Sequence, residues 1–101
     1  MNLIELNERV VEWAIEKGLD KANPRDQYLK VSEESGEVAA ALARGDKLAL
    51  KDGIGDVAVT LIILAKQSGM TLEECLQHAY DEIKGRTGQM VDGVFIKESD
   101  L

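Results

Sequence analysis

The stretch NPRDQYLKVSEESGEVAAALARGD, residues 23–46, decides the fold of this chain. Asn23 followed by Pro24 is a strong helix start, because the Asn side chain can cap free backbone amides and proline fits the first helical position. Gly45 is a typical helix stop, since glycine readily adopts the left-handed conformation that ends helices. The stretch therefore predicts one long helix between this start and this stop, and Asp46 is placed to cap the helix that follows.

Further helices are predicted on both sides of this stretch. Before it, apolar residues at three- and four-residue spacings predict a helix over residues 3–17. After it, residues 48–66 are apolar nearly all round the helix, which is typical of a helix buried in a bundle. Thr71 and Glu74 form a capping box, which predicts a fourth helix that ends near Lys84.

The C-terminal residues follow a different pattern. Residues 90–96 predict an extended tail or a short strand, broken at Asp92–Gly93. Four helices joined by short turns predict an all-α fold, a four-helix bundle-like domain with a short extended C-terminal tail. At 101 residues the chain is expected to form a single domain over residues 1–101.

The net charge limits what the chain can bind. Its 12 Lys and Arg against 19 Asp and Glu give a net charge of −7. This balance argues against a nucleic-acid polymer as partner, because such binding depends on cationic contacts to phosphates. A small phosphorylated ligand stays compatible with the charge, since a bound cation can reverse the local field.

The single cysteine and the short apolar runs indicate the compartment. Cys75 is the only cysteine, so no disulfide can form within the chain, as in proteins of the reducing cytosol. The N-terminus lacks the basic start and apolar run of a signal peptide. The longest apolar run, residues 57–65, is far shorter than the roughly 20 residues that a membrane span needs. We therefore expect a cytoplasmic protein with no membrane partner.

Three glutamates crowd the long helix. Glu33, Glu34 and Glu37 lie within one helical turn, so they can share one part of the helix surface. Like charges three or four residues apart destabilise a helix by about 0.2–0.5 kcal/mol per pair. The cluster is therefore either a solvated acidic face or a place where a bound cation offsets the repulsion.

Two aspartates in the next helix favour the cation. Asp52 and Asp56 are one turn apart, and Asp56 leads into the apolar run, so we expect it to be partly buried. Gly53 and Gly55 lower helix propensity, and close approach of another helix or of a ligand would compensate for this. Carboxylates from two helices around one cleft form an all-oxygen site. Such a site suits Mg²⁺ or Mn²⁺, and Mg²⁺ in turn suggests a phosphorylated substrate.

Lys84 and Arg86 form a basic group after the fourth helix, on either side of Gly85. Cations at this position are commonly partners of the helix dipole. They are also suited to clamp phosphate oxygens, and Lys97 adds a positive charge on the tail. Both interpretations stay open at this point.

The motif Gln27-x-x-Lys30-x-x-Glu33-Glu34-x-x-Glu37, followed by an Asp-containing helix, resembles that of the MazG-like all-α nucleoside triphosphate pyrophosphohydrolases. The tail KGRTGQMVDGVFIK, residues 84–97, is similar to short single-domain members found in phages and bacteria. The resemblance covers about residues 27–97. It implies hydrolysis of an NTP or dNTP between the α- and β-phosphates, which gives a monophosphate and pyrophosphate, with house-cleaning of the nucleotide pool as the expected role.

The family pattern, EExxE followed by ExxD, implies the metal ligands. Carried over by position, Glu34 and Glu37 match the first half and Asp56 matches the last residue. Gly53 stands where the family usually has Glu, and the neighbouring Asp52 lies about 100° further round the helix. Asp52 could therefore supply the missing carboxylate only with a shifted geometry or through water. The implied cofactor is Mg²⁺, with Mn²⁺ as the alternative.

The resemblance also implies roles for the residues around the metal. The metal ions neutralise the phosphates while a water molecule attacks phosphorus. Glu33 or Asp52 orients or deprotonates this water. Lys30, Lys84 and Arg86 contact phosphate oxygens and stabilise developing charge.

The remaining expectations concern the role of Trp13, the oligomeric state and the functions that are alternatives to an enzyme. Trp13 is either a surface on which the base stacks or a core residue. The small size and the apolar third helix predict a homo-oligomer, and the resemblance implies a dimer or a tetramer. One alternative to an enzyme is a non-catalytic acidic helical interaction module, which Gly53 favours. The other is a nucleotide-binding regulator that keeps the metal site without turnover.

Overall fold

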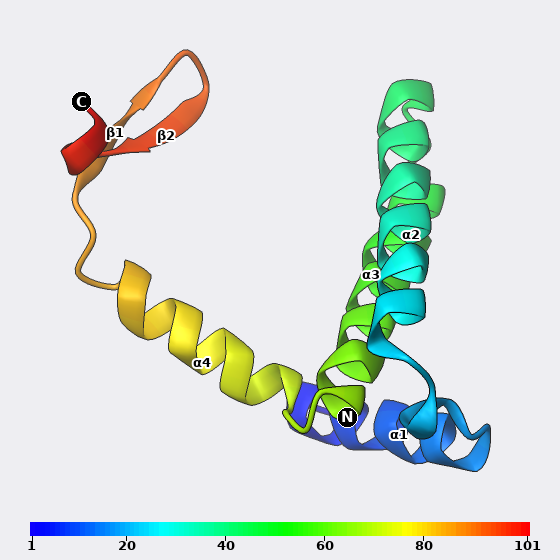
Figure 1. Ribbon diagram of the computed structural model, residues 1–101. Coiled ribbons are helices and arrows are strands. Elements are labelled where there is room, and N and C mark those ends of the chain that lie inside the picture. Colours follow the sequence, from blue (N-terminus) through cyan, green and yellow to red (C-terminus); the bar gives the residue numbers. More distant parts are fainter.

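Four helices and a C-terminal β-hairpin make up the fold (Figure 1). A computed structural model describes residues 1–101. The elements are α1 (Leu3–Glu16), a 3₁₀ helix (Leu19–Lys21), α2 (Pro24–Arg44), α3 (Lys47–Gln67), α4 (Leu72–Ile83), β1 (Gly88–Val91), β2 (Val94–Lys97) and a second 3₁₀ helix (Glu98–Asp100). The prediction of an all-α fold with a short extended tail is confirmed.

The helix ends follow the signals in the sequence. The Asn23 side chain accepts a hydrogen bond at 2.8 Å from the backbone N–H two residues later, and Asp46 accepts one at 3.0 Å from the N–H three residues later. Gly45, between the two long helices, has a φ of 65°, which is the left-handed conformation that favours glycine. Thr71 and Glu74 form the predicted capping box at the start of α4.

The helices α2 and α3 lie side by side and antiparallel, and they form the main packing unit of the chain (Figure 1). Near one end of this pair the buried Gln27 donates a hydrogen bond from Nε2 to the carbonyl oxygen of Thr60 at 3.2 Å. Near the other end, a Cβ on Gly53 would lie 3.0 Å from Cγ2 of Val38. Gly53 thus lets the two helices approach closely, whereas a Cβ on Gly55 would meet nothing.

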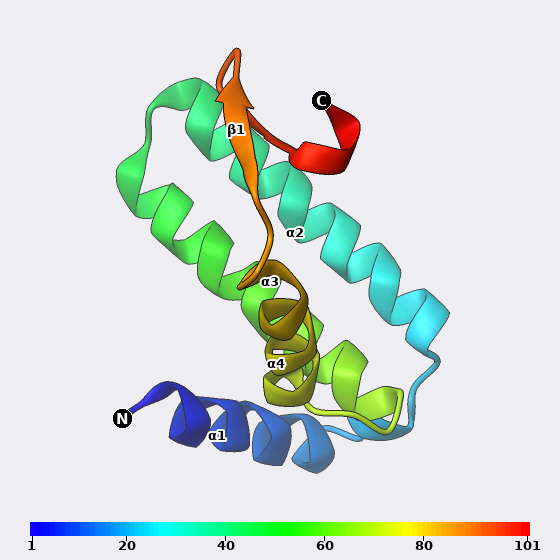
Figure 2. The same cartoon turned by 90° about the vertical axis from the view of Figure 1, so that its left-hand side faces the viewer.

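The buried core is small. Only nine of the 101 residues are buried, and the apolar ones are Ala14, Val31, Ala41, Ile62, Ile63 and Ala65. They lie between α2 and α3 and where α1 runs across the end of that pair (Figure 2). No helix combines the length and the apolar composition that crossing a bilayer requires.

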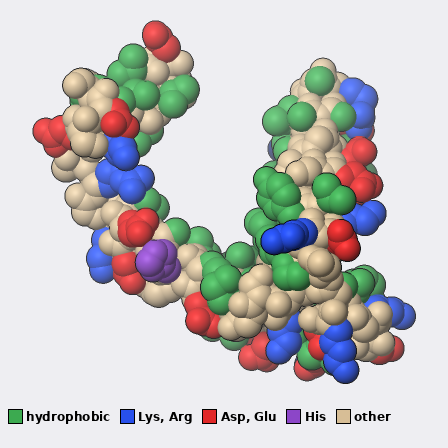
Figure 3. Space-filling view, in the orientation of Figure 1, with side chains coloured by type: hydrophobic (Ala, Val, Ile, Leu, Met, Phe, Trp, Pro, Cys, Tyr) green, Lys and Arg blue, Asp and Glu red, His purple; other side chains and the backbone are tan.

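The helix α4 turns away from the α2–α3 pair (Figure 1). The turn contains Gly69 with a φ of 75°, and α4 touches α3 near this turn. Beyond Cys75, which is half-buried, every residue of α4 is exposed. We refer to residues 72–101 as the arm. In the space-filling view, the arm and the α2–α3 pair form the two sides of a broad hollow (Figure 3).

The C-terminal hairpin ends the arm. Its strands pair antiparallel with Val91 opposite Val94, and the turn residues Asp92 and Gly93 have φ values of 50° and 81°. Two successive residues with positive φ are typical of the tight turns that join hairpin strands. The predicted break at Asp92–Gly93 is therefore the turn between two strands rather than the end of one.

Candidate active site

The predicted acidic ligands lie on one flank of the α2–α3 pair. Successive residues of a helix are rotated by about 100°. Counted from Gly53, which faces α2, this rotation places Asp52 and Asp56 on the same side. Counted from Val38, which faces α3, it places Glu34 and Glu37 on that side as well. We call it the acidic flank.

The acidic flank faces away from the arm. In Figure 3 the charged side chains of the pair gather on the side remote from the hollow, and hydrophobic ones gather on the side that borders it. Glu34 is half-buried, whereas Glu37, Asp52 and Asp56 are exposed. The expectation that Asp56 is partly buried is therefore wrong. Its position lies beside the stripe that packs against α2, and its carboxylate reaches solvent.

The acidic flank is not closed around an ion. No three Asp, Glu, His or Cys side chains come close enough together to hold a metal ion. The donors nevertheless fit Mg²⁺ or Mn²⁺ in kind, because carboxylate oxygens are ligands that both ions accept. The assignment of Glu34, Glu37, Asp52 and Asp56 as ligands therefore stays a prediction, one that requires their side chains to turn toward each other.

Glu33 and Lys30, two other residues of the motif, pair with each other. Nζ of Lys30 lies 3.3 Å from Oε2 of Glu33, and both side chains are mostly exposed. Exposed pairs of this kind contribute about 0–1 kcal/mol, so a ligand can separate them at little cost. Gln27, at the start of the same motif, is tied to the carbonyl of Thr60 and has a structural role.

The three predicted cations of the tail lie together on the arm. Lys84, Arg86 and Lys97 line one polar pocket of about 450 Å³, together with acidic neighbours such as Asp81. Lys84 pairs with Asp81, with Nζ 3.2 Å from Oδ1, and Arg86 makes no ion pair. The structure thus groups these cations, and their role in contacting phosphate stays a prediction. Within one chain, however, the arm carries them away from the α2–α3 pair (Figure 1).

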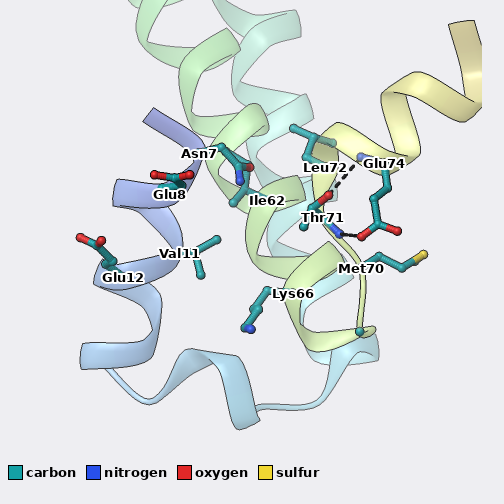
Figure 4. Close-up of a pocket in the computed structure, with 11 residues that line it drawn as sticks. Asn7, Glu8, Val11, Glu12, Ile62, Lys66, Met70, Thr71, Leu72 and Glu74 are labelled. Atoms are coloured by element: carbon teal, nitrogen blue, oxygen red, sulfur yellow. Dashed lines mark hydrogen bonds between the residues drawn. The ribbon is translucent and has the colours of Figure 1, made fainter. Parts of the chain in front are cut away.

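Trp13 and a second pocket lie near α1. Trp13 is 48% exposed, so it does not belong to the buried core of this chain. A pocket of about 460 Å³ lies between α1, α3 and the root of α4 (Figure 4). Lys66 is its one basic residue among three glutamates, and Oδ1 of Asn7 is buried there without a hydrogen-bond partner. This charge does not favour a phosphate. No sequence motif marks the pocket, because its residues come from three separate elements.

Comparison with known proteins identifies the family of the chain. The model of the MazG nucleotide pyrophosphohydrolase domain matches residues 22–91. The chain belongs to this family. The matched part contains α2, α3 and α4 with all the predicted ligands and the cations Lys84 and Arg86, and it leaves out Trp13 and Lys97.

One curated relative comes from a phage. The "uncharacterized 18.2 kDa protein in rep-hol intergenic region" of Haemophilus phage HP1 (strain HP1c1) is 35% identical to this MazG-family chain over 68 residues. The match covers 66% of this chain and 42% of the phage protein, so the chain spans less than half the length of that relative. No solved structure matches the chain.

Proposed function

We propose that this chain is a metal-dependent pyrophosphohydrolase that converts an NTP or dNTP into a monophosphate and pyrophosphate. Membership of the MazG nucleotide pyrophosphohydrolase family supports this class of reaction. The observation that carries the metal dependence is the acidic flank, where α2 and α3 each contribute two carboxylates to the same side of the helix pair. Removal of unwanted nucleotides from the cellular pool is the role that we propose for this activity.

The metal would be held by Glu34 and Glu37 from α2 together with Asp52 and Asp56 from α3. When bound, Mg²⁺ supplies positive charge at the phosphate oxygens and favours the deprotonated form of a coordinated water. Mn²⁺ would serve the same role, because it also prefers oxygen ligands. Asp52 takes the place of the family glutamate, since Gly53 has no side chain and its position is needed for packing against Val38.

The residues beside the metal would move the proton and bind the phosphates. Glu33, once Lys30 turns away from it, accepts a proton from the attacking water as the α–β phosphoanhydride bond breaks. Asp52 is the other carboxylate placed for this role. Lys30 is then free to contact a phosphate oxygen and to stabilise the charge that develops there. The exposed Lys30–Glu33 pair is thus a resting arrangement of two functional groups.

A nucleotide panel tests this proposal. The protein is incubated with ordinary and modified NTPs and dNTPs, with Mg²⁺, with Mn²⁺ and with a chelator, and pyrophosphate release is measured. We expect release only with a divalent ion. Glu37→Gln should lower the rate by about 100-fold or more, since a lost ligand removes several kcal/mol of charge stabilisation. Its thermal unfolding should be unchanged, because Glu37 is exposed.

The matched control is Glu16→Gln, which removes an exposed carboxylate at the end of α1, outside the matched domain. This variant should keep the native rate. If no nucleotide is hydrolysed under any condition, or if Glu37→Gln remains fully active, the proposed reaction or its ligand assignment is wrong.

The rival interpretation as a non-catalytic module rested on Gly53. A Cβ at this position would lie 3.0 Å from Cγ2 of Val38, so close packing of α3 against α2 explains the glycine. Loss of the family glutamate therefore does not require loss of the reaction. A nucleotide-binding regulator stays a possible outcome of the panel, recognised by thermal stabilisation with nucleotide and Mg²⁺ in the absence of product.

A further inference from the structure

The loop that joins α4 to the hairpin, residues 84–87 (Figure 1), carries a cation that no carboxylate neutralises. Each carboxylate among the residues of the adjoining polar pocket has a partner: Asp81 pairs with Lys84, Glu82 pairs with His78, and Glu98 accepts a hydrogen bond from the Thr87 hydroxyl. Arg86 lines the same pocket and forms no ion pair and no side-chain hydrogen bond. Its guanidinium therefore keeps its donors free, and these donors match the oxygens of phosphates.

The pocket beside this loop suits a compact oxyanion. It measures about 450 Å³ and no apolar residue lines it, so it offers little to a nucleobase or to a hydrocarbon group. Lys84 and Lys97 line it together with Arg86. Inorganic pyrophosphate, or the two terminal phosphates of an NTP, is the ligand of this chemistry that the proposed reaction supplies.

Two glycines would leave the loop mobile if nothing else held it. Gly85 and Gly88 flank Arg86 and Thr87, and glycine allows the backbone more conformations than any other residue. On the side of α4, the backbone N–H of Arg86 donates a hydrogen bond at 2.9 Å to the carbonyl oxygen of Ile83. On its other side, the loop depends on the hairpin.

The hairpin holds the loop through Thr87 and Glu98, which stand opposite each other one position beyond the paired strands. The backbone N–H of Glu98 donates to the carbonyl oxygen of Thr87 at 2.8 Å, and the Thr87 hydroxyl donates to Oε2 of Glu98. We call this pair the clasp. The strands close tightly beside it, because a Cβ on Gly88 would lie 2.6 Å from Cζ of Phe95 and 2.9 Å from Cα of Lys97.

We propose that Thr87 and Glu98 are positioning residues, which hold Arg86 in the pocket so that it binds the phosphates that leave as pyrophosphate. The choice of this ligand rests on the proposed function. The clasp fixes the residue that follows Arg86, and the bond to Ile83 fixes Arg86 itself. The ligand then meets an ordered loop and does not have to order it, which favours binding. The hairpin thereby supports an anion site to which its own strands contribute only Lys97.

The charge of Glu98 separates the clasp from a simple electrostatic role. A carboxylate beside an anion site repels the anion, so its removal should strengthen binding if charge were its only contribution. If Glu98 holds the loop through Thr87, its removal should weaken binding instead. The two roles therefore predict effects of opposite sign for the same substitution.

Pyrophosphate binding followed by NMR tests the clasp. The isotope-labelled full chain is titrated with inorganic pyrophosphate in the presence of a chelator, and the amide signals of residues 84–87 give the dissociation constant. Thr87→Val removes the hydroxyl and keeps the shape of the side chain. It should raise the dissociation constant about tenfold, the factor that corresponds to fixing one more residue on binding. Thr87→Ser, the matched control, keeps the hydroxyl and should bind as the native protein does.

The acidic partner gives a second comparison. Glu98→Ala removes the acceptor and should also raise the dissociation constant by about tenfold, although it removes a negative charge. Glu98→Gln keeps an acceptor oxygen and should not weaken binding. Asp100→Ala removes another carboxylate of the same 3₁₀ helix, one that lies 3.9 Å from Nζ of Lys97, and should bind pyrophosphate at least as tightly as the native protein.

A double variant tests whether the clasp acts through Arg86. Arg86→Ala should raise the dissociation constant by about tenfold or more, because it removes charge-assisted hydrogen bonds. Thr87→Val added to Arg86→Ala should raise it no further, since residues that act through one group are not additive. A clasp that served only the stability of the hairpin would not show this dependence on Arg86.

Four results would overturn the inference: no pyrophosphate binding by the native chain, native binding by Thr87→Val, tighter binding by Glu98→Ala, or a further loss when Thr87→Val is added to Arg86→Ala. The cross-strand contact of Met90 with Phe95 reports whether the hairpin persists. If Thr87→Val loses this contact, the comparison of Glu98→Ala with Glu98→Gln decides. A failed nucleotide panel with pyrophosphate binding retained would count against the proposed hydrolysis and leave the clasp intact.

Discussion

The α2–α3 pair and the arm are equally helical in sequence and differ in what holds them in place. The pair has a buried hydrogen bond between Gln27 and Thr60, and a glycine at the point of closest approach. The arm has a capped helix and a paired hairpin, yet its apolar side chains face solvent. Helix formation thus depends on local signals, whereas burial of the apolar side chains depends on a second apolar surface, the partner against which each region packs. The pair has this partner within the chain, whereas the apolar side chains of the arm stay uncovered.

The largest effect that this difference predicts concerns Arg86. The arm holds Arg86 away from the carboxylates of its own chain (Figure 1), so in the homodimer that the family resemblance implies we expect it to serve the site of the partner. Glu37→Gln and Arg86→Ala should each abolish most of the pyrophosphate release. When the two variants are unfolded and refolded together in equal amounts, about a quarter of the native rate should return, because half of the dimers are mixed and each of these has one intact site.

The control for this mixture is Glu37→Gln refolded with the double variant Glu37→Gln/Arg86→Ala, which contains no intact set of carboxylates and should stay inactive. A mixture that recovers nothing, although native protein refolds fully, would place Arg86 in its own chain's site. Full activity of Arg86→Ala alone would remove Arg86 from the site.

The next effect tests the packing of the α2–α3 pair. Gly53→Leu puts a large side chain where even a Cβ atom would lie 3.0 Å from Cγ2 of Val38. We expect the free energy of unfolding to fall by about 1–3 kcal/mol, the usual cost of overpacking. Gly55→Leu, two residues along the same helix in open space, should be neutral or stabilising, because leucine favours helices over glycine. Urea denaturation measures both, and equal destabilisation would contradict the close approach.

The smallest effect concerns the buried amide. Gln27→Met keeps the length of the side chain and removes its hydrogen bond to the Thr60 carbonyl, so we expect a loss of about 1 kcal/mol of stability. Gln77→Met removes an exposed hydrogen bond to Asp81 on the arm and should change stability much less. Thermal or urea unfolding compares them. If both variants lose the same stability, the pair gains nothing from its buried bond.

The sequence predicts those features of the structure that depend on residues close together in the chain. Asn23, Asp46 and the Thr71–Glu74 box fix where helices begin, because each bond they make spans at most three residues. The burial of Asp56 is predicted wrongly, since the side of α3 that meets α2 is decided by a contact between two helices. A sequence pattern shows that α3 is apolar almost all round and leaves open which stripe is covered.

The candidate site is predictable to the same extent. The helical spacing that groups the carboxylates within each helix is visible in the sequence, and so is the grouping of Lys84 and Arg86. The distance between the carboxylates and these two cations is not visible in the sequence, because it depends on the direction that α4 takes after Gly69. The pocket at Asn7 carries no local signal at all, since α1, α3 and the root of α4 each supply part of it.

The capping box of α4 separates the formation of this helix from its direction. Both of its bonds join Thr71 to Glu74, and the other side-chain bonds of α4, including that from the Cys75 thiol to the Met70 sulfur, join residues three to five positions apart. No side-chain hydrogen bond ties α4 to α1, α2 or α3. The helix can therefore pivot as a rigid rod at its first turn without losing one of them. Residues inside α4 make it a helix, and contacts outside α4 decide where it points.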